Sequence, residues 1–227
     1  MNGRLRLAHL HYPVTALGPG TRMGVWTQGC PLACPGCMSR STWDPQAGTP
    51  TDPSTVRAAW DRARAAGARG VTISGGEPLT QAEPLADTLD LLGDRGEADI
   101  LLYTGYEPGE LADLAENDRA VARCLARVDA VITGRYDQRR PTRLIWRGSA
   151  NQRLIPLTAR GRHRYRPHVD HAPDRPPMQV GADDDGGLWL IGVPRRGQLA
   201  QFTRALRDRG VGMEGVSWRP PPHTSAG

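Results

Sequence analysis

Hydrophobic and polar positions along the chain predict strands and helices in alternation. The amino-terminal segment 5–12 (LRLAHLHY) alternates as a strand does, and 23–28 (MGVWTQ) has the pattern of a buried strand. Three more short apolar runs end in glycine and are separated by helical patterns: 71–74 (VTIS), 99–104 (DILLYT) and 129–133 (DAVIT). This order indicates βα units and a mostly parallel sheet.

The local signals at the helix and strand ends add detail to this pattern. Asp52 and Pro53 predict a helix start, with a side-chain cap followed by proline at the first helical position. A further extended segment is expected around 143–146 (RLIW). The glycine-rich breaks follow the carboxyl ends of four predicted strands, where parallel sheets place their chemistry, so we expect one site at that edge.

The amino-acid composition of the chain changes near residue 160. Residues 160–177 are rich in arginine and proline, and we expect an exposed crossover there. The segments 178–183 and 188–193 predict a hairpin with its turn at 184–187, and an amphipathic helix follows. We therefore expect three parts: a core over residues 1–157, a ββα extension over 158–218 and a disordered tail over 219–227.

Composition limits the classes of protein to consider. The 227 residues, 38% of them hydrophobic, are enough for one domain with a small appendage. No segment approaches the roughly 20 apolar residues of a membrane span, so we expect a soluble, cytoplasmic protein without membrane contact. The net charge is +5 and every basic residue is arginine, which excludes mechanisms that need a lysine. The arginines are dispersed, so we expect no nucleic-acid binding; an acidic electron-donor protein would suit the basic surface.

Three cysteines carry the strongest chemical signal. Cys30, Cys34 and Cys37 stand in the motif TQGCPLACPGCMS, whose C-x3-C-x2-C spacing suits three corners of a cubane iron–sulfur cluster and leaves one iron without a protein ligand. A structural zinc site prefers four protein ligands, and the remaining cysteine, Cys124, lies far downstream in a predicted helix. No signal peptide precedes the cysteines to support a disulfide. The spacing favours an iron–sulfur cluster and leaves zinc, or neither, as alternatives.

The turn Gly75–Gly76–Glu77–Pro78 follows the cysteine loop by one βα unit. With the two motifs in this order the chain resembles the radical S-adenosylmethionine (SAM) superfamily. Within it, VWTQGCPLACPGC, LLYTGY and WRGSANQR are similar to the activating enzymes of glycyl-radical enzymes, above all those of the anaerobic ribonucleotide reductase type. These motifs cover residues 18–155. The resemblance implies an α/β fold, an incomplete (βα) barrel, with the small C-terminal ββα extension beside it.

The resemblance also implies specific chemistry. Cys30, Cys34 and Cys37 would hold a 4Fe–4S cluster whose open iron chelates the amino and carboxylate groups of SAM. Reductive cleavage then gives methionine and a 5′-deoxyadenosyl radical, which abstracts hydrogen from a glycine of a partner glycyl-radical enzyme. A flavodoxin- or ferredoxin-like donor would supply the electron. The expected SAM contacts are Gly75, Gly76, Glu77, Pro78, Thr104 and Gly105. An ammonium holds only donors, so a carbonyl beside a carboxylate suits it.

The polar stretch after residue 146 adds a second group of candidates. We expect Arg147, Ser149, Asn151 and Gln152 to line the mouth for SAM or substrate; the alternative is a surface loop. Tyr103 and Thr133 stand where some activating enzymes have acidic residues, which leaves the substrate open. Two other functions remain as alternatives. One is a stand-alone radical SAM enzyme acting on a small molecule or peptide, and the other is a non-catalytic iron–sulfur or zinc protein.

Overall fold

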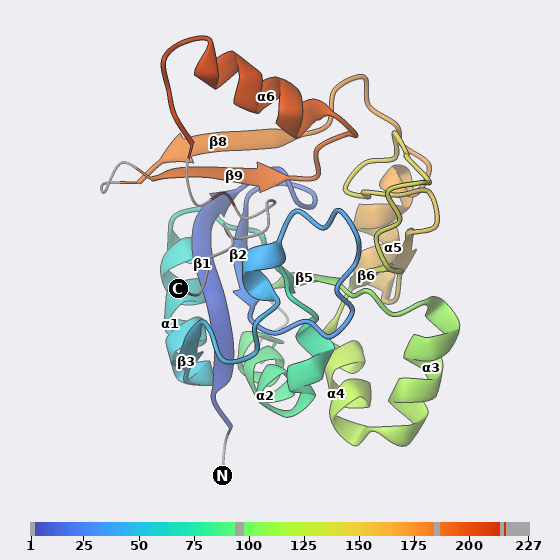
Figure 1. Ribbon diagram of the computed structural model, residues 1–227. Coiled ribbons are helices and arrows are strands. Elements are labelled where there is room, and N and C mark those ends of the chain that lie inside the picture. Colours follow the sequence, from blue (N-terminus) through green and yellow to red (C-terminus); the bar gives the residue numbers. More distant parts are fainter. Residues whose placement is uncertain (1–2, 94–97, 184–186, 214–215, 217–227) are drawn as a thin grey trace, which may run out of the picture.

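A seven-stranded mixed sheet forms the centre of the computed structural model, which describes residues 3–93, 98–183, 187–213 and 216 (Figure 1). Its strand order is β3-β1-β2-β4-β5-β6-β7. The strands are β1 (Leu5–Val14), β2 (Arg22–Thr27), β3 (Thr49–Thr51), β4 (Gly70–Gly75), β5 (Asp99–Tyr103), β6 (Ala130–Thr133) and β7 (Arg153–Pro156). The four central strands, β2, β4, β5 and β6, are mutually parallel, whereas β1, β3 and β7 run antiparallel to their neighbours. The predicted α/β class and the parallel centre of the sheet are confirmed.

The helices that connect the parallel strands, as the alternating pattern predicts, are α1 (Pro53–Ala65), α2 (Ala82–Gly93), α3 (Pro108–Asn117) and α4 (Arg119–Arg127). Two further helices, α5 (Ala159–Tyr165) and α6 (Gln198–Arg207), follow β7 in the chain. The described residues also form the short 3-10 helices η1 (Arg40–Thr42), η2 (Pro78–Gln81) and η3 (Arg166–His168). None of the helices among the described residues is long and apolar enough to cross a membrane.

The main hydrophobic core lies between the sheet and helices α1, α2 and α4. Side chains alternate across each strand, so Val25, Val71 and Ile100 point to this core from β2, β4 and β5. Trp60 of α1 and Leu89 of α2 meet them and are fully buried. Each such large apolar side chain stabilises the fold by about 1.5–3 kcal/mol relative to an exposed one. This packing fixes the parallel strands and aligns their carboxyl ends.

The other face of the sheet is covered by two separate elements. Tyr165 of α5 packs with Leu101, Ile132 and Trp146 in a second core. The hairpin of β8 (Met178–Ala182) and β9 (Leu188–Gly192) carries α6 and lies at one end of the molecule, at the top of Figure 1. Its Ile191 packs with residues of the β1–β2 connection in a third core. The predicted hairpin and following helix are confirmed as secondary structure; the boundary at residue 157 stays a prediction.

Three local expectations differ from the structure. The segment around 143–146 is a turn in which Trp146 has φ +60°, and the strand is β7, because the pairing partner of β6 is 153–156. The crossover after residue 160 contains α5, whose Tyr165 is fully buried, so this segment is only partly exposed. Asp52 precedes α1 but makes no capping bond, because its carboxylate accepts from Arg4 instead. The predicted tail 219–227 and most of the turn 184–187 lie outside the described residues.

Candidate active site

The cysteine loop starts where β2 ends and is closed at its base by main-chain hydrogen bonds. The N–H of Gly29 donates to the carbonyl of Thr42 (2.8 Å), and the N–H of Cys30 donates to that of Trp43 (3.0 Å). The side chain of Gln28, which is buried, donates to the carbonyls of Ser41 and Asp44 at 3.0 and 2.9 Å. These contacts hold the two ends of the loop together, so the cysteines between them stand on a fixed base.

All three loop cysteines carry free, partly exposed thiols, whereas Cys124 is buried in α4. Burial raises the pKa of the Cys30 thiol and of the Cys34 thiol. Among the described residues, no group of three or more His, Cys, Asp or Glu side chains could hold a single metal ion. A cubane cluster is different, because each cysteine binds a different iron and the thiolates surround the cluster. The arrangement of the loop cysteines is therefore compatible with a cluster.

The Gly75–Pro78 turn lies directly against the base of the cysteine loop. The N–H of Gly76 donates to the carbonyl of Thr27, and that of Glu77 donates to the carbonyl of Gly29, both at 2.9 Å. Gly75 has φ +111°, a backbone conformation that L side chains rarely adopt. A Cβ on Gly76 would lie 2.2 Å from the carbonyl oxygen of Gly29. Both glycines are thus required by the close approach of the two segments.

Glu77 joins the end of β4 to the end of β5. Its side chain is buried, and the carboxylate accepts hydrogen bonds from the N–H of Leu79 (3.1 Å), the hydroxyl of Thr104 (2.9 Å) and the N–H of Gly105 (2.7 Å). Burial raises the pKa of this carboxyl group, although the three hydrogen bonds oppose the shift. The predicted contacts Glu77, Thr104 and Gly105 are therefore brought together. The hydrogen bonds from Thr104 and Gly105 to the Glu77 carboxylate join the three residues to one another.

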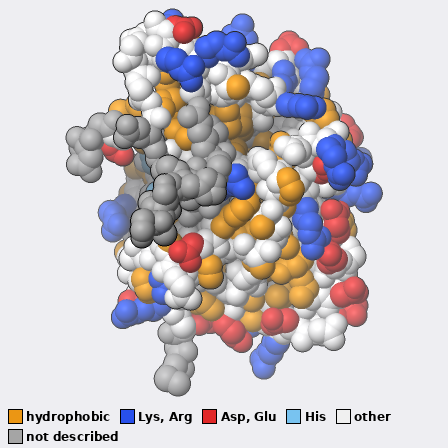
Figure 2. Space-filling model, viewed as in Figure 1, with side chains coloured by type: hydrophobic (Ala, Val, Ile, Leu, Met, Phe, Trp, Pro, Cys, Tyr) orange, Lys and Arg blue, Asp and Glu red, His pale blue; other side chains and the backbone are white. Residues whose placement is uncertain are grey.

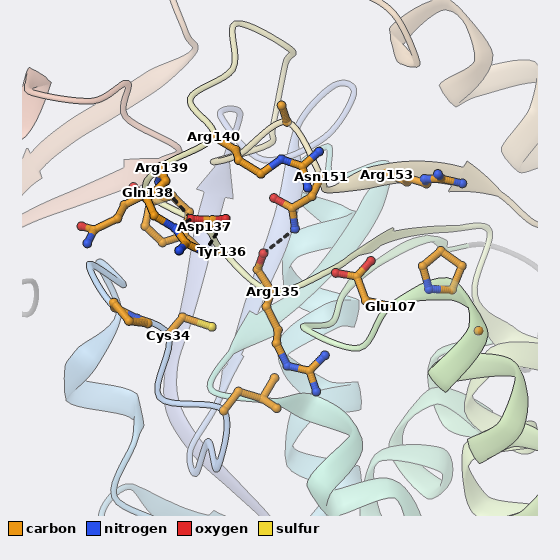
Figure 3. Close-up of a pocket in the computed structure, with 15 residues that line it drawn as sticks. Cys34, Glu107, Arg135, Tyr136, Asp137, Gln138, Arg139, Arg140, Asn151 and Arg153 are labelled. Carbon is orange, nitrogen blue, oxygen red and sulfur yellow. Dashed lines mark hydrogen bonds and ion pairs between the residues drawn. The ribbon is translucent and has the colours of Figure 1, made fainter.

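A cavity of about 1030 Å³ opens beside the cysteine loop (Figure 3). Its walls come from the cysteine loop, the start of α3 and the connection between β6 and β7. The lining residues are Leu32, Cys34, Pro35, Glu107–Gly109, Arg135–Arg140, Ala150, Asn151 and Arg153. Asn151 donates to the carbonyl of Arg135 (2.8 Å), while its own Oδ1 is buried without a partner in the described part of the chain. Asn151 therefore ties the backbone of Arg135 to the cavity wall.

Comparison with known proteins identifies the family. A family model described as a 4Fe-4S single cluster domain matches residues 16–155. The anaerobic ribonucleoside-triphosphate reductase-activating protein of Enterobacteria phage T4 is 34% identical over 140 residues, which cover 60% of this chain and 85% of that protein. The protein of the same name from Escherichia coli K12 is 33% identical over 161 residues, covering 63% and 94%. The chain belongs to this radical SAM family. The crystal structure of QueE from Escherichia coli overlaps 45% of this chain and 53% of its own, with a TM-score of 0.36 and 21% identity.

The cofactors of this radical SAM family are a single 4Fe–4S cluster and SAM, and the C-x3-C-x2-C motif falls inside the matched region. The Gly75–Pro78 turn and the cavity-lining residues fall inside it as well. The hairpin and α6 lie beyond it. The family match thus coincides with the part of the fold that forms the site.

The residues of the polar stretch predicted to line the mouth have different roles in the structure. Asn151 lines the cavity, but the other three side chains shape the connection itself. The guanidinium of Arg147 is buried and donates to the carbonyls of His168 and Val169 at 3.1 and 2.6 Å. Ser149 accepts from the N–H of Asp137, and Gln152 accepts from the N–H groups of residues 148 and 149. These residues hold the loop in place.

Several site residues were missed by the reasoning from sequence. Tyr136 is one: its ring lies between Gly36 of the cysteine loop and Gly148, where added Cβ atoms would lie 3.3 and 2.9 Å from it. Its backbone N–H also hydrogen-bonds the thiol of Cys34. Arg135 pairs with Glu110 of α3 at 2.6 Å. The available signal was Gly134, which marks the end of β6 and places the following residues at the site edge.

Proposed function

We propose that this protein activates a glycyl-radical enzyme of the anaerobic ribonucleotide reductase type. When bound, the cluster supplies one electron and SAM supplies the 5′-deoxyadenosyl radical that removes hydrogen from a glycine of the partner. The proposal rests mainly on the geometry of the cysteine loop. The loop is closed at its base by hydrogen bonds, packs closely against the Gly75–Pro78 turn, and lines one cavity. The names of the relatives support the choice of partner. We also propose that the sheet forms the incomplete (βα) barrel expected of the superfamily, which its four parallel strands and their connecting helices support.

The three loop cysteines, Cys30, Cys34 and Cys37, are the proposed ligands of the cluster. All three are free and partly exposed, and within the described part of the chain the hydrogen bonds to their sulfurs come from backbone N–H groups. Such N–H···S bonds are retained in iron–sulfur sites and tune their potentials. The rigid base of the loop fixes the spacing of the thiolates.

SAM is proposed to lie against the Gly75–Pro78 turn. Glu77 carries a buried carboxylate whose partners are neutral donors, and the ammonium of SAM would supply the missing positive charge. Thr104 and Gly105 would act by orienting that carboxylate. Asn151 lies at the cavity wall and would form part of the mouth for SAM or substrate. Arg147, Ser149 and Gln152 would maintain the wall that presents Asn151.

Anaerobic reconstitution with iron and sulfide tests the proposal. We expect the reduced protein to release 5′-deoxyadenosine from SAM and to place a glycyl radical, seen by electron paramagnetic resonance, on an anaerobic ribonucleotide reductase. Cys34→Ala should abolish cluster formation. Cys124→Ala provides the matched control, because it also removes one free thiol but from the interior of α4.

The outcomes separate the alternatives. Full iron content in Cys34→Ala would contradict the ligand assignment. Absence of 5′-deoxyadenosine from the reconstituted wild type would contradict radical SAM chemistry. Release of 5′-deoxyadenosine without a glycyl radical on the reductase would instead support the stand-alone enzyme acting on a small molecule or peptide.

A further inference from the structure

The cavity carries more positive charge than SAM requires. Four arginines line it, against the two carboxylates of Glu107 and Asp137. Arg135 is paired with Glu110 and Arg139 with Asp137. Among the described residues, no hydrogen bond or ion pair joins the guanidinium of Arg140 or of Arg153 to another group. SAM itself carries a sulfonium and an ammonium against one carboxylate, so further cations at the mouth would repel it.

Arg140 and Arg153, which we call the arginine lip, stand opposite the cysteine loop. Figure 3 shows them on the side of the cavity across from Cys34, with Asn151 beside them. Cys34, unlike Cys30 and Cys37, is among the residues that line this cavity. In the space-filling view basic side chains gather over the upper part of the molecule, and acidic ones over the region of α3 and α4 (Figure 2). The lip therefore places unpaired positive charge at the same cavity that Cys34 of the cysteine loop lines.

We propose that the arginine lip docks the acidic protein that reduces the cluster. The inference rests on the proposed function only in that a cluster is bound by the loop cysteines. In the step concerned, one electron passes from the reduced donor to the oxidised cluster, and the donor is oxidised by one electron. No bond forms or breaks. Electron transfer slows steeply with distance, so a donor must dock where the cluster lies closest to solvent. Complementary charge would steer it to that place.

A charge-reversal pair tests the lip with photoreduced flavodoxin as the probe. The variant is Arg140→Glu/Arg153→Glu in the reconstituted holoprotein. The control, Arg62→Glu/Arg69→Glu, makes the same change of charge on exposed side chains; Arg69 precedes β4 and so lies at the opposite end of that strand from the site. Flavodoxin binding is measured by calorimetry and cluster reduction by stopped flow, each over a range of salt concentrations. Reduction by photoreduced deazaflavin, a small molecule, reports whether the cluster is intact.

We expect the lip variant to weaken flavodoxin binding and slow reduction by about tenfold or more at low salt, and to flatten the salt dependence. The control should stay within about twofold, since its arginines lie away from the lip. Deazaflavin should reduce all three proteins equally. Unchanged binding by the lip variant, or an equal loss in the control, would overturn the proposal.

One further outcome assigns the lip to another protein. If the variant binds flavodoxin normally but no longer forms the glycyl radical on the reductase, the lip serves the reductase and the proposal is wrong. Failure of the proposed function is a separate result: the wild type reduced by deazaflavin would then release no 5′-deoxyadenosine. The donor-binding comparison would still be readable in that case.

Discussion

Replacing Arg22 with leucine tests the buried ion pair that joins the parallel strands at the end opposite the site. The guanidinium is fully buried at the start of β2, where it donates to the hydroxyl of Thr72 (2.7 Å), the carboxylate of Asp99 (2.7 Å) and the carbonyls of Val71 and Asp99 (2.7 and 2.8 Å). One side chain thus joins β2, β4 and β5 at their amino ends. Removing one partner of a buried ion pair costs about 3–5 kcal/mol.

The contacts that remain set the expected size of the loss. Asp99 would still accept from the hydroxyl of Tyr165 (2.8 Å) and pair with Arg164 (3.2 Å), so its charge would not be left alone. The lower end of the range, about 3 kcal/mol, is therefore expected. For a chain of this size 1 kcal/mol shifts the melting temperature by about 2–4 °C, which gives a loss of about 6–12 °C.

Thermal unfolding followed by circular dichroism measures this loss in the apoprotein. The matched control is Arg4→Leu, which breaks the ion pair with Asp52, whose two side chains are 64% and 54% exposed. An exposed pair contributes about 0–1 kcal/mol, so the control should lose no more than about 4 °C. A loss of melting temperature in Arg22→Leu no larger than in Arg4→Leu would refute the reasoning that burial makes this ion pair contribute more to stability than an exposed one.

Three further predictions concern the site and Cys124. Gly76→Ala should prevent the turn from packing against the cysteine loop and so lower the iron content after reconstitution, because its Cβ would lie 2.2 Å from the carbonyl oxygen of Gly29. The control Gly109→Ala, whose new Cβ has nothing within 4 Å, should keep the wild-type iron content. Equal iron contents in the two variants would count against the packing argument. Burial raises the folded-state pKa of Glu77, so this group stabilises the apoprotein below its unfolded pKa and loses that contribution as the pH rises through its folded pKa. Melting temperatures from acidic to neutral pH should therefore fall for the wild type relative to Glu77→Gln, and the opposite trend would contradict the sign of the shift. Burial raises the pKa of the Cys124 thiol to about 12, so iodoacetamide should label the loop cysteines of the apoprotein before Cys124, as mass spectrometry of the peptides would show; equal labelling would mean that α4 opens.

Sequence reasoning located the strand ends and misjudged several side chains at them. Glycines at the ends of β2, β4, β5 and β6 could be recognised because breaks in a regular pattern are local signals. The strand predicted at 143–146 was wrong because an apolar run of three residues, 144–146, fits a buried turn as well as a strand. What decided between them was the pairing of β6, which joins residues far apart in the chain.

The roles of individual polar residues required the tertiary structure. Arg147 looked like a mouth residue because arginine is seldom buried, yet three carbonyl contacts hold it inside. The sequence around Arg22 does not indicate that this side chain is buried, because its partners Thr72 and Asp99 belong to other strands. Tyr136 reaches the cysteine loop only because the connection after β6 folds back across the sheet edge.

The sequence by itself determined the chemistry that is local in the chain: three thiols on one loop, a glycine turn one βα unit later, and strands whose ends share an edge. These depend on spacing and on backbone preferences, which a few neighbouring residues specify. The tertiary structure alone decided which charges are paired and which face the cavity. Burial and ion pairing depend on residues brought together from distant elements, and this is how the arginine lip is left free while Arg22 is enclosed.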